Sequence, residues 1–210
     1  MATSSISNNT RKIPDSFYRN DDVVFIAKSL IGKELYTFID GALTGGIVAE
    51  TEAYAGVVDK ASHAYGNRRT PRTEVMYAEG GISYVYFSYG MHYLFNVVTA
   101  VKDIPHAVLI RGIIPVRGIE IQQERRQTTL PLNMLTNGPA KLCQALGLDL
   151  RHNGISLTGN KVWIENNDRP VKNEMIRVGP RVGVGYAAED AALPYRFILK
   201  DIRYKPVAHR

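Results

Sequence analysis

The chain has 210 residues, of which 45% are hydrophobic and 22% charged, a balance that is typical of one globular domain. Its net charge of +6 indicates a polyanionic partner such as nucleic acid, with a solvated basic surface as the alternative. The single cysteine, Cys143, excludes a disulfide or a four-cysteine cluster, and the histidine spacing matches no zinc hydrolase or zinc deaminase, so neither metal nor cofactor is expected. No apolar run could span a bilayer and no signal-peptide pattern is present, so an intracellular protein without membrane contact is expected.

The N-terminal part predicts a leader followed by a helix. Residues 1–12 are rich in Ser, Asn and Thr, a composition typical of disorder. The run Asn20-Asp21-Asp22 offers a cap for a helix over residues 23–31, and Gly32 is a natural stop. The role expected for this helix is core packing.

Two strands are predicted next, over residues 34–39 and 43–54, joined by a turn at Asp40-Gly41. Gly45-Gly46 in the second strand indicates a bulge or a close backbone approach. The second strand ends in a pair of carboxylates, Glu50 and Glu52, which share a face because they are two residues apart. Either one of them does chemistry, or both lie on a solvated face.

Residues 55–71 form a polar loop that carries His63, and loops on rigid strands often hold functional side chains. The β-rich runs within residues 82–96, separated by Tyr89-Gly90-Met91, predict a hairpin with an aromatic at its tip. Tyr84 and Phe87 are expected to pack in the core. A tyrosine at a protruding tip suits a wedge that enters a base stack.

Residues 107–114 predict a buried strand that contains one cation, Arg111. A buried arginine needs a carboxylate partner, and Glu52 is the expected one. A helix is predicted over residues 116–130, and a second over residues 137–147. The second helix contains Lys141 and either holds a phosphate or is an ordinary capped surface helix.

The last third predicts short strands around residues 161–165, 174–178 and 196–200. The glycines of residues 179–185 indicate close backbone approach, but their spacing is not that of a dinucleotide fingerprint. No internal repeat is found.

Taken together, these stretches resemble the alkyladenine (3-methyladenine) DNA glycosylase family. The matching stretches are residues 50–54, His63, residues 68–72, 84–86, 89–91, Asn96, residues 109–111, 138–146 and 181–185, which follow one another in order.

The resemblance implies a compact single-domain α/β (α+β) fold over residues 13–205, with a mixed, mainly antiparallel sheet, surrounding helices and a protruding β-hairpin. It implies a monofunctional glycosylase of base excision repair, which flips alkylated or deaminated purines (3-methyladenine, 7-methylguanine, hypoxanthine) out of double-stranded DNA and hydrolyses the N-glycosidic bond. The enzyme would approach from the minor-groove side, act as a monomer and leave an abasic site. Its compartment would be the cytoplasm or nucleoid of a bacterium, or the nucleus of a eukaryote.

The matched positions imply that Glu52 activates a water that Arg111 and the backbone carbonyl of Val182 also hold, while Glu50 has a supporting role. The other implied contacts are to the base and to the DNA. They are Tyr54, His63 and Tyr86 on the faces of the extruded base, Asn96 in the pocket wall, Tyr89 in the gap left by the base, and Arg68, Thr70, Arg72, Met91 and Lys141 on the DNA backbone. Arg69 is an additional arginine beside the pocket.

Two other functions fit part of the pattern. A damage-binding protein could flip bases with the same aromatics and not cut them, although Glu52 and Arg111 argue against this. An RNA-binding sheet could stack bases on Tyr84 and Tyr86, although the chain lacks the RNP pattern of such sheets.

Overall fold

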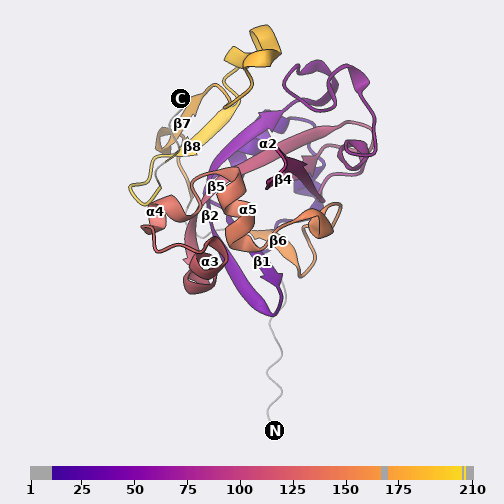
Figure 1. Cartoon of the computed structure of the whole chain (residues 1–210). Coiled ribbons are helices and arrows are strands. Elements are labelled where there is room, and N and C mark those ends of the chain that lie inside the picture. The colour runs from indigo at the N-terminus through magenta and orange to yellow at the C-terminus, as the bar shows by residue number, and fades with distance from the viewer. Residues whose placement is uncertain (1–10, 167–169, 205, 207–210) are drawn as a thin grey trace.

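Strand β2 (Ala42–Tyr54) lies at the centre of the sheet (Figure 1). The computed structural model describes residues 11–166, 170–204 and 206. Along one edge β2 pairs with β5 (His106–Arg117) over almost its whole length. Along its other edge it pairs first with β1 (Glu34–Ile39) and then, through Glu50–Glu52, with β8 (Arg196–Leu199). The half of β2 that carries the two carboxylates is therefore flanked on both sides.

The remaining described strands extend this sheet. They are β3 (Ser83–Ser88), β4 (His92–Thr99), β6 (Val162–Glu165) and β7 (Ile176–Gly179). The order is β3-β4-β5-β2-β1-β6, and β7 pairs with β8, which pairs with β2. Every pairing between described strands is antiparallel, so the single-domain α/β fold with a mainly antiparallel sheet is confirmed.

The glycines of the β1–β2 hairpin explain its geometry. Asp40 and Gly41 both have positive φ, 53° and 74°, as a tight hairpin turn requires. A Cβ on Gly46 would lie 2.3 Å from the carbonyl oxygen of Ile114, and the register with β5 shifts between Gly45 and Gly46. The predicted bulge and the predicted close approach are therefore both present.

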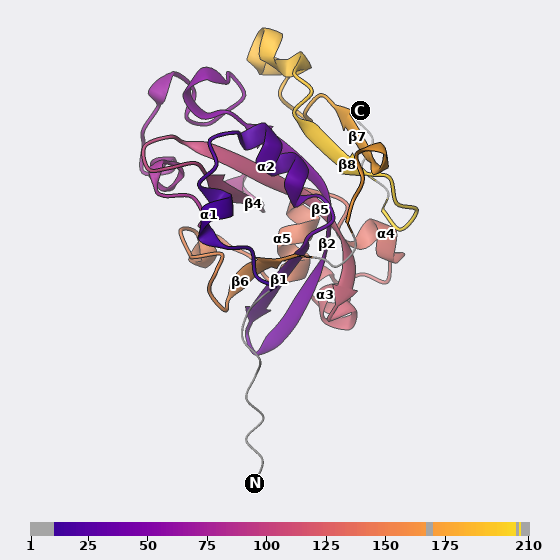
Figure 2. The same ribbon diagram turned by 180° about the vertical axis from the view of Figure 1, so that it is seen from behind.

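Helices cover both faces of the sheet. α2 lies in front of it in Figure 2, whereas α5 lies in front of it in Figure 1. The α-helices are α1 (Asp15–Tyr18), α2 (Val23–Leu30), α3 (Ile119–Arg126), α4 (Leu132–Leu135) and α5 (Pro139–Leu146). Short 3₁₀ segments are η1 (Gly56–Val58), η2 (Tyr65–Asn67), η3 (Glu74–Tyr77), η4 (Leu150–His152), η5 (Asn173–Met175) and η6 (Gly185–Ala192). The cap predicted within Asn20-Asp21-Asp22 is present: the side chain of Asp22 accepts from the backbone N–H of Phe25 at 2.8 Å.

Two predictions about these elements are wrong. The helix expected over residues 116–130 is only α3, because Val116 and Arg117 continue β5 and Gly118, with φ 62°, separates strand from helix. Phe87 is predicted in the core, but it lies near the end of β3, is 44% exposed and packs against the ring of Tyr93. Tyr84, by contrast, is buried.

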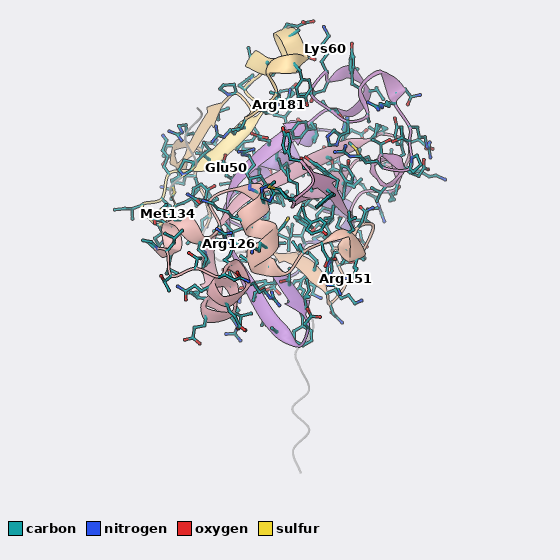
Figure 3. All side chains as sticks on the ribbon, viewed as in Figure 1. Glu50, Lys60, Arg126, Met134, Arg151 and Arg181 are labelled. Atoms are coloured by element: carbon teal, nitrogen blue, oxygen red, sulfur yellow. The ribbon has the colours of Figure 1, made fainter. Side chains whose placement is uncertain are left out.

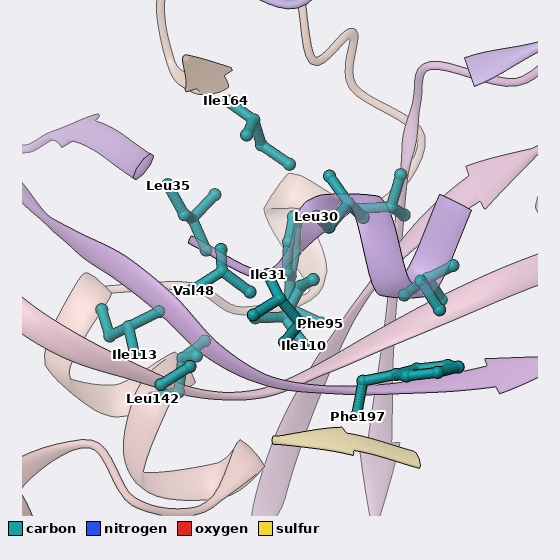
Figure 4. Packing of buried hydrophobic residues seen from close by; sticks show 14 of the residues in the cluster. Leu30, Ile31, Leu35, Val48, Phe95, Ile110, Ile113, Leu142, Ile164 and Phe197 are labelled. Atoms are coloured by element: carbon teal, nitrogen blue, oxygen red, sulfur yellow. The ribbon is translucent and has the colours of Figure 1, made fainter. Parts of the chain in front are cut away.

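The main core lies between the sheet and its helices (Figure 4). Leu30 of α2, Ile110 of β5 and Leu142 of α5 are fully buried in one cluster. Burying each such side chain contributes about 1.5 to 3 kcal/mol to folding stability. The cluster therefore holds β2 and β5 firmly in place.

The expected leader lies mostly outside the described residues, which begin at residue 11. Lys12, its last residue, pairs with Glu165 in an isolated bridge, and its Nζ donates to the carbonyl oxygen of Gly159 at 2.7 Å. Within the described part of the chain, no helix has the length and apolarity needed to cross a membrane.

Candidate active site

Glu52 is a fully buried carboxylate with a donor on each oxygen. The backbone N–H of Val182 donates to Oε1 at 2.7 Å, and the hydroxyl of Tyr54 donates to Oε2 at 2.8 Å. Nη1 of Arg111 lies 3.4 Å from both oxygens. Burial and the charge of Glu52 raise the pKa of Tyr54 well above its ordinary value, so Tyr54 remains a proton donor to this carboxylate.

Arg111 is bound more closely by Glu50 than by Glu52, the partner that the sequence predicted. Its Nε donates to Oε1 of Glu50 at 2.8 Å. The reason is the register: β5 pairs Gly112 with Glu50 and Ile110 with Thr51, so Arg111 is the extra residue of a bulge and its side chain reaches both acids. Burial lowers the pKa of Arg111, but the charges of Glu52 and Glu50 outweigh this and raise it.

Glu50 has two further donors. Nε of Arg196 on β8 donates to its Oε1 at 2.7 Å, and the hydroxyl of Tyr204 donates to its Oε2 at 2.5 Å. Gly112 makes the second contact possible, because a Cβ there would lie 2.1 Å from the Tyr204 hydroxyl. Glu50 therefore anchors Arg111, which agrees with the supporting role expected for it.

A cavity of about 310 Å³ opens beside this network, at the small end of the range for ligand sites. Its wall includes the aromatic residues Tyr54, His63, Tyr84, Tyr86, Tyr89 and Tyr186, together with Arg72, Ser88, Asn96, Pro139, Arg111 and Val182. Glu52 is not part of this wall. Three of its neighbours, Tyr54, Arg111 and Val182, are, so the carboxylate lies directly behind the cavity surface.

His63 is held between two partners. Its Nδ1 lies 2.8 Å from the Tyr84 hydroxyl, and its Nε2 lies 3.3 Å from Nη2 of Arg72. A guanidinium can only donate, so Nε2 is the acceptor and the proton resides on Nδ1. Burial first, and then the charges of Arg72 and Arg68, lower the pKa of His63 to about 4.

His63 is therefore expected to stay neutral at pH 7. By NMR its ring should titrate near pH 4, far below the ordinary value of about 6.5. Arg72→Gln removes one nearby positive charge and should raise the titration midpoint. The rise should be partial, because the burial that also lowers the pKa remains. The unfolded chain binds more protons between these two values, so the contribution of this group to stability falls as the pH drops through that window. A midpoint near 6.5 in the folded wild type would contradict this.

The turn between β3 and β4 presents two large exposed side chains. Tyr89 is 89% exposed and Met91 is 68% exposed. Tyr89 has φ 51°, a left-handed conformation that a bulky residue rarely adopts. Gly90, with φ 70°, shares this conformation, as in the tight turn at Asp40-Gly41, so the turn geometry presents the Tyr89 ring to solvent.

The arginines predicted to meet DNA differ in their surroundings. Arg72 is exposed, and its guanidinium lies 4.7 Å from the centroid of the Tyr86 ring. Arg68, Thr70 and Arg72 border a second hollow of about 380 Å³ next to the cavity. Arg69 instead donates to both oxygens of Glu74 and to Asp103, so its charge is neutralised.

Two predicted residues have mainly local contacts. Nδ2 of Asn96 donates to the carbonyl oxygen of Tyr84 at 3.0 Å, which holds Asn96 in the cavity wall. Nζ of Lys141 donates to Oδ1 of Asn137 at 2.8 Å, beside the first turn of α5.

The sequence interpretation assigned no role to several residues around the site. They are Asp59, Tyr186, Arg196 and Tyr204, and the side chain of Arg181. Asp59 and Arg181 are far apart in the chain, so only the fold reveals that they meet. The glycines after Arg181 were the available signal.

A buried carboxylate behind an aromatic cavity with a basic border suits an enzyme that acts on a planar base attached to a polyanion. Among the described residues, no cluster of His, Cys, Asp and Glu could hold a metal ion.

Comparison with known proteins agrees with this class. A family model for methylpurine-DNA glycosylase matches residues 16–203. The chain is 48% identical over 196 residues to a protein of Chlamydia felis, covering 93% of this chain and 100% of that one. It is 50% identical over 188 residues to one of Chlamydia abortus (89% and 97% covered) and 43% identical over 198 residues to one of Clostridium acetobutylicum (90% and 94%). All three carry the name "Putative 3-methyladenine DNA glycosylase".

The chain belongs to the methylpurine-DNA glycosylase family. It is a DNA repair enzyme that hydrolyses N-glycosyl bonds, and DNA is its substrate. The alternatives of a damage-binding protein and an RNA-binding sheet are accordingly set aside.

Proposed function

We propose that this enzyme extrudes an alkylated or deaminated purine, of the 3-methyladenine, 7-methylguanine and hypoxanthine class, from duplex DNA. A water activated by Glu52 then hydrolyses the N-glycosidic bond. The observation that carries the proposal is the position of Glu52 directly behind the aromatic cavity, with Arg111 and Val182 at the wall between them. The product is an abasic site in an uncut strand.

Cleavage of the bond develops positive charge on the sugar. A carboxylate beside the sugar stabilises that charge and accepts a proton from the attacking water. Each oxygen of Glu52 has one short hydrogen bond, and its second lone pair has only the long 3.4 Å contact with Arg111, which a water at the cavity wall would replace. Arg111 and the Val182 carbonyl would hold the same water.

The aromatic wall would hold the base. Extrusion costs a few kcal/mol, least for a damaged pair, and stacking of a base on an aromatic ring returns about 1 to 3 kcal/mol. Tyr54, His63 and Tyr86 would enclose the base and supply this stacking. Because its lowered pKa leaves His63 without a charge at neutral pH, the proposal assigns His63 to contact with the base and not to acid catalysis.

Tyr89 would fill the space that the base leaves. Tyr89→Ala is expected to weaken binding to lesion duplex by about 5- to 150-fold, which corresponds to a loss of about 1 to 3 kcal/mol of stacking. A titration with labelled duplex at fixed salt measures this. Phe87→Ala, which removes another exposed ring of the same hairpin, is the control and should change affinity little. Equal losses in both variants would contradict the wedge.

The proposal extends to the partners and the setting of the enzyme. Arg68, Thr70, Arg72, Met91 and Lys141 would contact the backbone of double-stranded DNA from the minor-groove side. The enzyme would act as a monomer inside the cell.

The test is a panel of duplexes, each with one modified base, treated with enzyme and then with alkali. Alkali-labile sites are expected with hypoxanthine, 3-methyladenine or 7-methylguanine, and none with undamaged duplex. Strand cleavage before the alkali step would indicate a lyase, and the absence of any labile site across the panel would refute the proposal.

A further inference from the structure

A second buried ion pair, Asp59–Arg181, lies behind the proposed active site. The Arg181 side chain has no solvent exposure and that of Asp59 has 1%. Both terminal nitrogens of Arg181 donate to the Asp59 carboxylate, Nη2 to Oδ1 at 2.9 Å and Nη1 to Oδ2. Arg181 lies in the upper half of Figure 3.

The pair joins three segments of the chain. Nη1 of Arg181 also donates to the carbonyl oxygen of Ala53 on β2 at 2.9 Å, and Nη2 donates to that of Asp190 at 3.1 Å. Asp59 accepts from the backbone N–H groups of Ala55 and Ala61 at 2.9 and 3.0 Å. The end of β2, the loop after it and the segment at 181–190 are thereby held together.

The guanidinium also lies close to two aromatic rings. Its Cζ is 4.9 Å from the centroid of Tyr54 and 5.2 Å from that of Tyr195. A cation near an aromatic face is attracted to it, and here the ring is one that lines the cavity. Arg181 therefore contacts the residue proposed to stack on the base.

Arg181 is connected to both short hydrogen bonds of Glu52. One donor is the N–H of Val182, the next residue in the chain, and the other is the hydroxyl of Tyr54, whose ring the guanidinium contacts. We propose that Arg181, oriented by Asp59, is a positioning residue. It sets the geometry of Glu52 and Tyr54 for hydrolysis of the N-glycosidic bond. This inference rests on the proposed function.

The chemistry of the Asp59–Arg181 pair favours a role in positioning neighbouring groups over a role in stabilising the fold. Apolar residues of similar volume often replace a buried ion pair with no loss of stability, so a fully buried pair is weak support for a stabilising role. A planar guanidinium, in contrast, directs several donors at fixed angles. This one side chain donates four hydrogen bonds, and the one to Ala53 fixes the end of β2 relative to the segment that carries Val182.

The test compares Arg181→Lys and Arg181→Met with wild type and Glu52→Gln. Three quantities are measured: single-turnover base release at saturating enzyme, affinity for a duplex with a tetrahydrofuran abasic analogue, and the thermal midpoint. Misplacement by about 1 Å can slow a reaction about 100-fold, so Arg181→Met is expected to slow release by about that factor. Arg181→Lys keeps the charge but not the fork and is expected to be about tenfold slower than wild type. Affinity for the analogue, which has no base to stack, should change less than about twofold in either variant.

Arg125→Met is the matched control. Arg125 is partly buried, whereas Arg181 is fully buried; it too donates to backbone carbonyls, those of Ile39 and Ala145, but it lies on α3 and is not part of the cavity wall. Its neighbour Arg126 is labelled below Arg181 and Glu50 in Figure 3. This variant is expected to lower the thermal midpoint without slowing base release.

The outcomes separate the claims. A folded Arg181→Met with the wild-type rate would overturn the positioning role, and if that variant does not fold, a wild-type rate in Arg181→Lys would do so. Loss of abasic affinity in parallel with rate would also overturn it, because that indicates general disruption. If wild type releases no base from any lesion, the proposed function fails and this inference fails with it. If wild type is active, Glu52→Gln is slow and the Arg181 variants keep the wild-type rate, the inference alone fails.

Discussion

Glu52→Gln is expected to slow single-turnover base release by about 10²- to 10⁴-fold, the usual contribution of a general base. The amide has no site that can accept the proton of water at neutral pH. It also carries no negative charge to stabilise the developing positive charge on the sugar. Measurement of released base under saturating enzyme isolates this step from product release.

The glutamine variant should retain its fold. Its amide oxygen can accept from the N–H of Val182, and its amide nitrogen can donate to the oxygen of Tyr54, which then turns its own proton elsewhere. Arg111 keeps Glu50 as its partner. Affinity for lesion duplex should therefore remain within about threefold, since stacking and backbone contacts are unchanged. Full activity in Glu52→Gln would show that the catalytic assignment is wrong.

Glu50→Gln is expected to have the largest effect on stability, a loss of about 3 to 5 kcal/mol in the free energy of unfolding. The carboxylate accepts from two buried guanidinium groups, those of Arg111 and Arg196, and from Tyr204. A neutral amide leaves an excess of buried positive charge. That loss is a large fraction of the free energy of unfolding of a typical domain, which is about 5 to 15 kcal/mol.

Urea unfolding at constant pH and salt measures this change. Glu189→Gln is the control, because Glu189 forms an exposed ion pair with Lys60 and is expected to leave the unfolding free energy unchanged. Activity of Glu50→Gln should also fall, since Arg111 loses its closest partner. An unfolding free energy equal to that of wild type would contradict the anchoring role.

Local patterns predicted the elements that depend on short-range chemistry. The Asp40-Gly41 turn, the cap within residues 20–22 and the helix predicted over residues 137–147 all follow from conformational preferences of the residues themselves. The helix expected from residue 116 failed because pairing with Gly45 extends β5 through Arg117, a long-range interaction that no local pattern contains.

The same distinction holds for the site. The period-two spacing of Glu50 and Glu52 and the need of a buried Arg111 for an acid could be read from the sequence. The bulge that places Arg111 closest to Glu50 could not, because it depends on the register between two strands. Tyr204 and Asp59 were missed for a similar reason: each reaches the site through a contact between segments more than 100 residues apart in sequence.

The central claim is hydrolysis of the bond between a damaged purine and its sugar. The most direct measurement is quantification of free base by chromatography with mass detection, after incubation of the enzyme with a duplex that contains one hypoxanthine. We expect free hypoxanthine in an amount equal to the abasic sites formed, with the strand intact until alkali is added. The contradicting result would be tight binding to the lesion duplex with no abasic site formed and no free base released, from hypoxanthine or from any other modified purine.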